Sequence, residues 1–345
     1  MLERVDAPLP GSPRLPWSRL PGGLRDALDE ALASPVVDVS PRAGGFSPGP
    51  AAVVSCADGT RAFVKAVGTP LNPHTPQLLR TEAAVATQLP EHLPVPRLRA
   101  HVEWTGPAEA DGEWVALVFD VVDGAPPPLP WTRPTATRVL TALAEFAVLA
   151  TPCPADVPTL GDQMAHELGA WRVLAEDPPA DLSPAEREHL DWLAEVPDRL
   201  TARGGLVGDT LVHLDLRADN LLLTDDGGVV LLDWPWAARG PAWVDSVVLA
   251  LDAAVHGGLD PETLVAGSPV VTAADPRDVT DLLGGLAGLW AVTMRRPPAP
   301  GLPTLRAFQR RFHDAALDWM VRRATGARTS SPSPGWAARG GAGIL

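Results

Sequence analysis

The chain has 345 residues, of which 46% are hydrophobic and 20% charged, a composition that excludes intrinsic disorder and suffices for two lobes with a sizeable core. It carries 28 basic and 42 acidic residues, and the resulting net charge of −14 argues against a nucleic-acid partner. The most apolar long segment, Leu282–Met294, has 13 residues and is too short to span a bilayer.

The N-terminus and the cysteines indicate the compartment. The segment Met1–Trp17 contains Glu3, Asp6 and several prolines where a signal peptide would need an apolar run. Cys56 and Cys153 lack the spacing of a zinc site or a disulfide scaffold. We therefore expect a cytoplasmic protein without a membrane partner.

Two residue types are rare in this chain. Arginine occurs 27 times but lysine only once, at Lys65, and asparagine occurs only at Asn72 and Asn220. A compact ammonium on a flexible stem is not replaced by a planar guanidinium, so a site that needs an ammonium would retain Lys65. Chance retention is the alternative, and the position of Lys65 in the chain has to decide.

The chain opens with a proline-rich arm and a short helix. Leu24, Leu28 and Leu32 recur at helical spacing between acidic residues, which predicts an amphipathic helix over residues 22–33. We assign residues 1–34 to an N-terminal extension that carries this helix.

A Gly-rich loop with Gly44, Gly45 and Gly49 follows, and it lies among three predicted strands. Glycine lets backbone N–H groups approach phosphate oxygens, and a nearby lysine supplies the countercharge. Lys65 lies on the third strand, beyond the hairpin turn at Asp58-Gly59. The predicted strands cover residues 36–39, 51–56 and 61–67.

A helix is predicted over residues 76–89, and Glu82 lies among its apolar positions. A buried acid needs a partner, for which Lys65 is the first candidate and a surface pair with Arg80 the alternative. Two more strands, over 100–104 and 114–118, complete a lobe that we assign to residues 35–122.

The remainder is predicted to be mainly helical. Residues 123–326 form a second lobe, in which Ser183, Pro184 and Glu186 make a capping box with a favoured start. The tail, residues 327–345, is of low complexity and is expected to be disordered. Helices are predicted over 134–149, 161–174, from 184 onward, and over 246–254, 278–294 and 305–324.

The most informative stretch is Leu211–Asn220, followed by a hairpin over residues 221–232 and then Asp233. Its polar members Asp215 and Asn220, together with Asp233, stand at the ends of apolar strands, where they need a partner such as a divalent cation. The spacing His-x-Asp-x-x-x-x-Asn, with an Asp about a dozen residues on, is the pattern by which kinases hold a base and two metal ligands.

The order of these features resembles the aminoglycoside phosphotransferase and small-molecule kinase family, over roughly residues 35–325. The family usually has Gly where this chain has Leu214. The resemblance implies an α+β, two-lobed protein-kinase-like fold, with a small antiparallel-sheet N-lobe carrying one main helix and a larger, mostly helical C-lobe. No Ala-Pro-Glu segment or long activation loop follows Asp233, which argues against a kinase of proteins.

The resemblance also implies roles for single residues. Asp215 would accept the proton of the substrate hydroxyl, and Arg217 would neutralise charge on the transferred phosphoryl group. Asn220 and Asp233 would hold Mg²⁺. The nucleotide would be held by the Gly-rich loop, by the charged pair and by backbone near the end of the fifth strand, that is, by Gly44, Gly45, Gly49, Lys65, Glu82, Asp120 and Val122.

We therefore expect an ATP- and Mg²⁺-dependent phosphotransferase, monomeric or homodimeric, that acts on a hydroxyl of a small molecule. GTP stays open as the nucleotide, and the acceptor could be an aminoglycoside or other antibiotic, a sugar or an amino alcohol, with a cationic acceptor suiting the acidic chain. Asp245 and Asp252 are candidate acids for holding it. The alternative is a catalytically silent nucleotide-binding scaffold or regulator.

Overall fold

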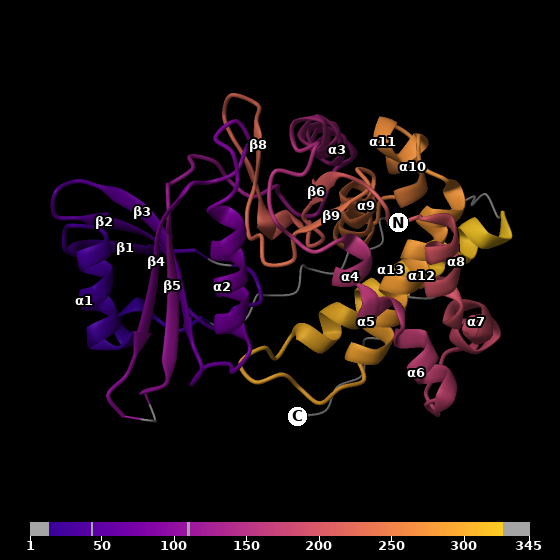
Figure 1. Ribbon diagram of the computed structural model, residues 1–345, viewed down its shortest axis with the longest axis horizontal. Coiled ribbons are helices and arrows are strands. Elements are labelled where there is room, and N and C mark those ends of the chain that lie inside the picture. Colours follow the sequence, from indigo (N-terminus) through magenta and orange to yellow (C-terminus); the bar gives the residue numbers. More distant parts are fainter. Residues whose placement is uncertain (1–13, 43, 109–110, 327–345) are drawn as a thin grey trace, which may run out of the picture.

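The computed structural model describes residues 14–42, 44–108 and 111–326. The predicted disordered tail and the first thirteen residues of the arm lie outside this range. A sheet with two helices forms one lobe, drawn in indigo and violet in Figure 1, and helices form most of the other. The α+β, two-lobed fold expected from the sequence is confirmed.

The N-lobe sheet has five antiparallel strands in the order β1-β2-β3-β5-β4. Lys65 on β3 pairs with Ala51 on β2 and with Leu117 on β5, so it lies at the centre of the sheet. The predicted strands agree with the observed ones to within two residues. They are β1 (Val36–Pro41), β2 (Ala51–Cys56), β3 (Arg61–Gly68), β4 (Leu98–Thr105) and β5 (Glu113–Phe119).

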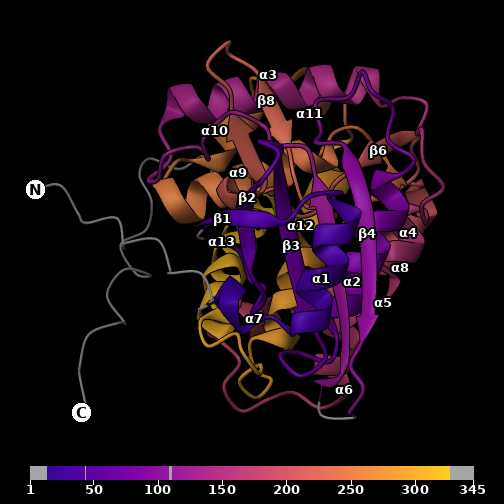
Figure 2. The same cartoon turned by 90° about the vertical axis from the view of Figure 1, so that its left-hand side faces the viewer.

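Alternation along the strands gives the sheet two apolar faces, each covered by one helix. On β5, Trp114, Ala116 and Val118 pack in the cluster that contains α1 (Gly22–Ala31). Their neighbours on the other face pack in the cluster that contains α2 (Thr75–Ala86). Figure 2 looks onto this lobe with α1 in front. Lys65 therefore points to the α2 side, because it alternates with residues that face α1.

The C-lobe is mainly helical, and its core continues into the end of α2. The predicted helix over 161–174 is observed as three short helices, which are separated at Met164 (φ −104°, ψ 9°) and at Gly169 (φ −77°, ψ −3°). The capping box at Ser183 is present. The helices are α3 (Arg133–Leu149), α4 (Leu160–Gln163), α5 (Ala165–Leu168), α6 (Ala170–Glu176), α7 (Pro184–Ala194), α8 (Val196–Arg203), α9 (Val244–Gly257), α10 (Pro261–Val265), α11 (Pro269–Thr272), α12 (Pro276–Thr293) and α13 (Leu305–Thr325). Of the described helices, none combines the length and hydropathy of a membrane span.

Two small two-stranded sheets flank the loop that contains Asp215. Strand β6 (Thr210–Val212) pairs with β9 (Ala238–Gly240), and β7 (Leu221–Leu223) pairs with β8 (Val229–Leu231) as the predicted hairpin. The N–H of Leu232 donates to the carbonyl of Asn220 at 2.9 Å, which closes the base of the hairpin. The stretch that contains Asp215 therefore leaves one short strand and enters another.

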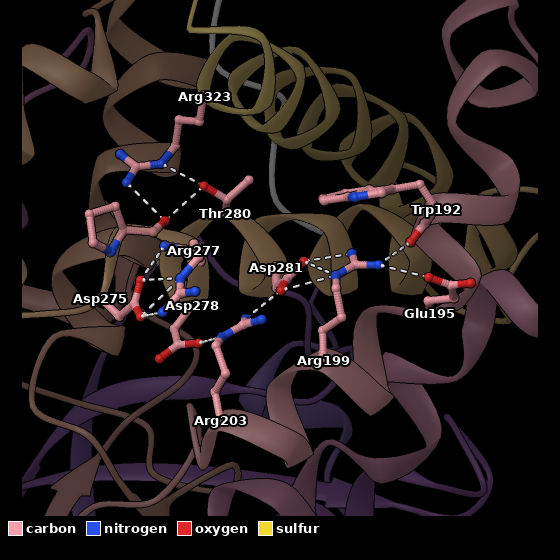
Figure 3. Close-up of polar contacts among 11 residues, drawn as sticks. Trp192, Glu195, Arg199, Arg203, Asp275, Arg277, Asp278, Thr280, Asp281 and Arg323 are labelled. Atoms are coloured by element: carbon pink, nitrogen blue, oxygen red, sulfur yellow. Dashed lines mark hydrogen bonds and ion pairs between the residues drawn. The ribbon is translucent and has the colours of Figure 1, made fainter.

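Charged side chains join α8 to α12 in the C-lobe (Figure 3). Arg199 and Arg203 lie one turn apart on α8, and Asp278 and Asp281 lie one turn apart on α12. The guanidinium of Arg199 donates to Asp281 Oδ1 at 2.6 Å, and that of Arg203 donates to Asp278 Oδ1 at 2.6 Å. Arg203 also donates to Asp281 Oδ2. Because the Asp281 side chain is only 3% exposed, both arginines are needed to offset its desolvation.

The contribution of buried Asp281 to stability can be compared with that of exposed Glu195, which pairs with the same Arg199. Asp281→Asn should lower the free energy of unfolding by about 2–3 kcal/mol, because two guanidinium groups lose their charged acceptor. Glu195 is 71% exposed and lies 3.7 Å from Arg199. Glu195→Gln should change stability by less than about 0.5 kcal/mol. Urea unfolding measures both, and equal effects would contradict this account.

Candidate active site

The loop between β6 and β7 gathers three of the predicted site residues. The amide Nδ2 of Asn220 donates to Asp215 Oδ2 at 3.0 Å and to the Asp215 carbonyl at 2.7 Å. Arg217 donates to the other carboxylate oxygen of Asp215, and its Nε donates to Asp219 Oδ1 at 3.0 Å. Asp215 is therefore fixed through both of its oxygens, and its side chain stays 28% exposed.

Asp245 of α9 forms hydrogen bonds with the backbone of this loop. Its carboxylate accepts the N–H groups of His213 at 2.8 Å and Leu214 at 3.0 Å. Leu214 has φ +66°, in the left-handed region that favours glycine, which explains why the family motif usually has Gly there. Since Asp245 is buried, it serves to shape the loop and is not presented to a ligand.

His213 is fully buried and contacts Leu232, the residue before the metal-ligand candidate Asp233. Its Nδ1 accepts the N–H of Asp215 at 3.3 Å, so the proton is on Nε2, which donates to the Leu232 carbonyl at 2.7 Å. Burial lowers the pKa of His213, although Asp245 opposes this. A neutral histidine packed on Trp234, with ring centroids 4.6 Å apart, fits the structural role expected from the sequence.

Lys65 joins the two lobes. Its Nζ binds Glu82 of α2 in a salt bridge and donates to Asp233 Oδ1 at 2.7 Å. Glu82 is only 2% exposed, and Arg80 pairs instead with Glu103 and Glu113, so the alternative partner weighed for Glu82 is wrong. The sole lysine, the helical acid and the acid after the hairpin thus meet at one point.

The charges at this point are strongly coupled. Burial raises the pKa of Glu82 to about 7 and that of Asp215 to about 6, although Lys65 and Arg217 respectively oppose these shifts. Burial also disfavours ionised Asp233, but the charge and hydrogen bond of Lys65, together with the charge of Arg217, outweigh burial and lower the Asp233 pKa to about 2. Asp233 is therefore a carboxylate throughout the physiological range.

The Gly-rich loop between β1 and β2 approaches the loop between β6 and β7 that contains Asp215. Gly44 and Gly45 have φ +98° and +76°, which L side chains rarely adopt. A Cβ on Gly44 would lie 3.6 Å from the Asp219 Cβ, so the two loops lie close together. Gly49 differs, because a Cβ there would lie 1.8 Å from the Ala66 carbonyl oxygen, and it is needed for close packing on β3.

The strand end proposed to contact the nucleotide base is partly used by the fold. The N–H of Asp120 donates to the Arg97 carbonyl at 2.9 Å, and the Asp120 carboxylate pairs with Arg99. Val122 follows two residues later and is half-buried. The Asp120 N–H is therefore not available to a base.

A cavity of about 210 Å³ lies between the Gly-rich loop, residues 217–219 of the loop between β6 and β7, and side chains of α9 and α13. The guanidinium of Arg217 faces it, 5.5 Å from the Phe46 ring and 5.6 Å from the Phe308 ring. Buried Asp252 accepts from the Ala218 N–H at 3.1 Å and pairs with His256 at 2.8 Å. The cavity is lined by Gly44, Gly45, Phe46, Leu129, Arg217, Ala218, Asp219, Asp252, His256 and Phe308.

The oxygen atoms of Asn220 and Asp233 fit a magnesium ion. Asn220 uses its amide N–H group toward Asp215, which leaves Oδ1, and Asp233 uses Oδ1 toward Lys65, which leaves Oδ2. Mg²⁺ in phosphotransfer sites is bound by one or two protein oxygens, with phosphates and water completing the octahedron. Within the described residues, no group of three or more His, Cys, Asp or Glu side chains could hold a metal alone.

The structural roles of three residues that shape this site were missed from the sequence. Asp245 and Asp252 were expected only as acids for the acceptor, whereas both are buried and hold backbone N–H groups of the loop between β6 and β7, and Asp252 also lines the cavity. No role was expected for Arg14, whose side chain reaches the Gly-rich loop. Acids within an apolar helical run were the available signal for Asp245 and Asp252.

The comparisons with known proteins identify the family of this chain. The family model described as "Phosphotransferase enzyme family" matches residues 38–272, more than half of the chain. The search of curated proteins gave no match.

Among solved structures, one similar chain is a thermostable mutant of the aminoglycoside phosphotransferase APH(4)-Ia in ternary complex with ADP and hygromycin B (15% identity, 89% of this chain and 100% of that chain, TM-score 0.58). Choline kinase LicA from Streptococcus pneumoniae is also similar (13%, 88% and 100%, 0.51). So is the macrolide 2′-phosphotransferase MphH from Brachybacterium faecium (20%, 86% and 98%, 0.50). At these identities the solved structures show a shared fold, whereas the family model identifies the family. The chain belongs to the phosphotransferase enzyme family, as the sequence motifs indicated.

Proposed function

We propose that this enzyme transfers the γ-phosphoryl group of ATP to a hydroxyl of a small molecule in a Mg²⁺-dependent reaction, with Asp215 as the base. One observation supports this most directly. Asp215 is oriented through both carboxylate oxygens, by Asn220 and Arg217, yet its side chain stays 28% exposed, and its partner Arg217 lines a cavity. A base must be fixed and within reach of its substrate, and Asp215 meets both conditions.

The reaction follows from this arrangement. The acceptor hydroxyl donates its proton to Asp215 while its oxygen attacks the γ-phosphorus, and the bond from that phosphorus to the bridging oxygen of ADP breaks. Arg217 lies beside Asp215 and would stabilise charge on the equatorial phosphoryl oxygens. Lys65, held by Glu82, would bind the α- and β-phosphates. Mg²⁺ held by Asn220 and Asp233 would neutralise charge between the β- and γ-phosphates.

The acceptors to be tested first form a smaller set than all compounds with a hydroxyl group. Similar structures are named for an aminoglycoside, for choline and for a macrolide, so an antibiotic, a sugar or an amino alcohol is the first set to test. The net charge of −14 favours cationic members of that set, and we propose that the enzyme acts in the cytoplasm.

The function is tested by screening such acceptors with purified enzyme for ADP formation. Turnover should depend on the acceptor, and EDTA should abolish it because the oxygens of Asn220 and Asp233 act through a metal. Restoring Mg²⁺ should restore turnover. ADP formation that is unaffected by any acceptor and by EDTA would refute the proposal.

Asp215→Asn should lower kcat by about 100-fold or more, because an amide cannot accept the hydroxyl proton. The Kd for ATP should stay unchanged, because Asp215 faces the acceptor. Asp225, exposed in the β7–β8 turn, offers a matched control, and Asp225→Asn should leave kcat unchanged. Steady-state kinetics with calorimetry measures all three, and equal kcat values for the two variants would contradict the role of Asp215.

Asp245 can be tested as the support of the catalytic loop. Asp245→Ala should lower the free energy of unfolding by about 2–4 kcal/mol, since two buried N–H groups lose their acceptor. Asp245→Asn keeps one oxygen and should lose less. In both variants kcat should fall in the same order as stability. An alanine variant with wild-type stability and kcat would show that Asp245 does not shape the loop.

A further inference from the structure

Arg14 precedes the first described helix and reaches into the Gly-rich loop. Its Nη2 donates to the Gly44 carbonyl at 2.6 Å, and its Nε donates to the same oxygen at 3.2 Å. Its Nη1 donates to the Gly49 carbonyl at 2.9 Å. Since Gly44 and Gly49 stand near opposite ends of the loop, one guanidinium ties both ends together. The backbone supports this contact, because the Leu15 N–H donates to the Pro48 carbonyl at 2.8 Å.

The guanidinium also lies in the field of the site's carboxylates. Burial lowers the pKa of Arg14, whereas the charges of Asp233 and Asp219 oppose this shift. A Cβ on Gly45 would lie 3.0 Å from Arg14 Nη2 and 3.9 Å from Asp219 Oδ2. Arg14 therefore lies on the side of the Gly-rich loop that is near Asp219, where the phosphates of a nucleotide would lie.

Arg14 has donors to spare for such phosphates. A guanidinium carries five N–H groups, and among the described residues three of them have acceptors. The other two belong to the terminal nitrogens, the pair that binds phosphate oxygens in protein sites. A free arginine would lose conformational entropy on binding, but Arg14 is already held by two carbonyls.

We propose that Arg14 is a second phosphate-binding cation, which acts with Lys65 and fixes the Gly-rich loop over the triphosphate. The inference rests on the proposed function, since it assumes that ATP binds between these loops. It adds a residue from the N-terminal arm to a site otherwise built from the two lobes. A purely structural clamp would stabilise the loop without distinguishing ATP from adenosine.

The experiment measures the Kd of the full chain for ATP with Mg²⁺, and for adenosine, by calorimetry. Arg14→Gln should weaken ATP binding by about 10-fold or more, because a charged hydrogen-bonding partner of the phosphates is lost. Adenosine binding should not change. Arg14→Lys keeps the charge but cannot span both carbonyls, so its Kd for ATP should be intermediate.

Arg19 is exposed on the same arm, and Arg19→Gln is the matched control that should bind ATP as the wild type does. Arg14→Gln with wild-type affinity for ATP would overturn the inference. Tighter ATP binding by Arg14→Gln would also overturn it, because Arg14 would then obstruct the site. Equal weakening for ATP and adenosine would overturn it too, because Arg14 would then only hold the loop in place. A wild-type chain that binds no ATP would instead refute the proposed function.

Discussion

The ion pairs of Lys65 hold the site together. The ammonium of Lys65 contacts Glu82 of the N-lobe helix α2 and Asp233 of the C-lobe. Asp233 lies 168 residues after Lys65 in the chain. Burying Glu82 without Lys65, or Lys65 without its two acids, would cost several kcal/mol. Each charged group therefore offsets the cost of burying its partners. The relative position of the lobes near the cleft depends on this contact, and the phosphates would bind beside it.

A second set of buried acids, Asp245 and Asp252, shapes the loop between β6 and β7 by accepting its backbone N–H groups. Asp245 holds the N–H groups of His213 and Leu214, and Asp252 holds that of Ala218. Each carboxylate is desolvated and each is compensated by hydrogen bonds, which makes the loop rigid. Rigidity matters here because phosphoryl transfer requires little more than positioning and charge neutralisation.

Local pattern was enough for the strands, the hairpin and the capping box, because each depends on neighbours in the sequence. The pairing of Glu82 with Lys65 could also be predicted, since a lone lysine and a buried acid have few partners. The roles of Asp245 and Arg14 could not, because both depend on contacts with backbone distant in the chain. The break at Met164 was missed since the apolar periodicity runs through it unchanged.

The central claim is that a phosphoryl group moves from ATP to a carbon-bound hydroxyl. Phosphorus NMR on a reaction with the acceptor found by screening tests it most directly. The account predicts a new phosphomonoester signal that grows in step with ADP and is absent with Asp215→Asn. ADP accompanied only by inorganic phosphate, in the wild type and in Asp215→Asn alike, would contradict it.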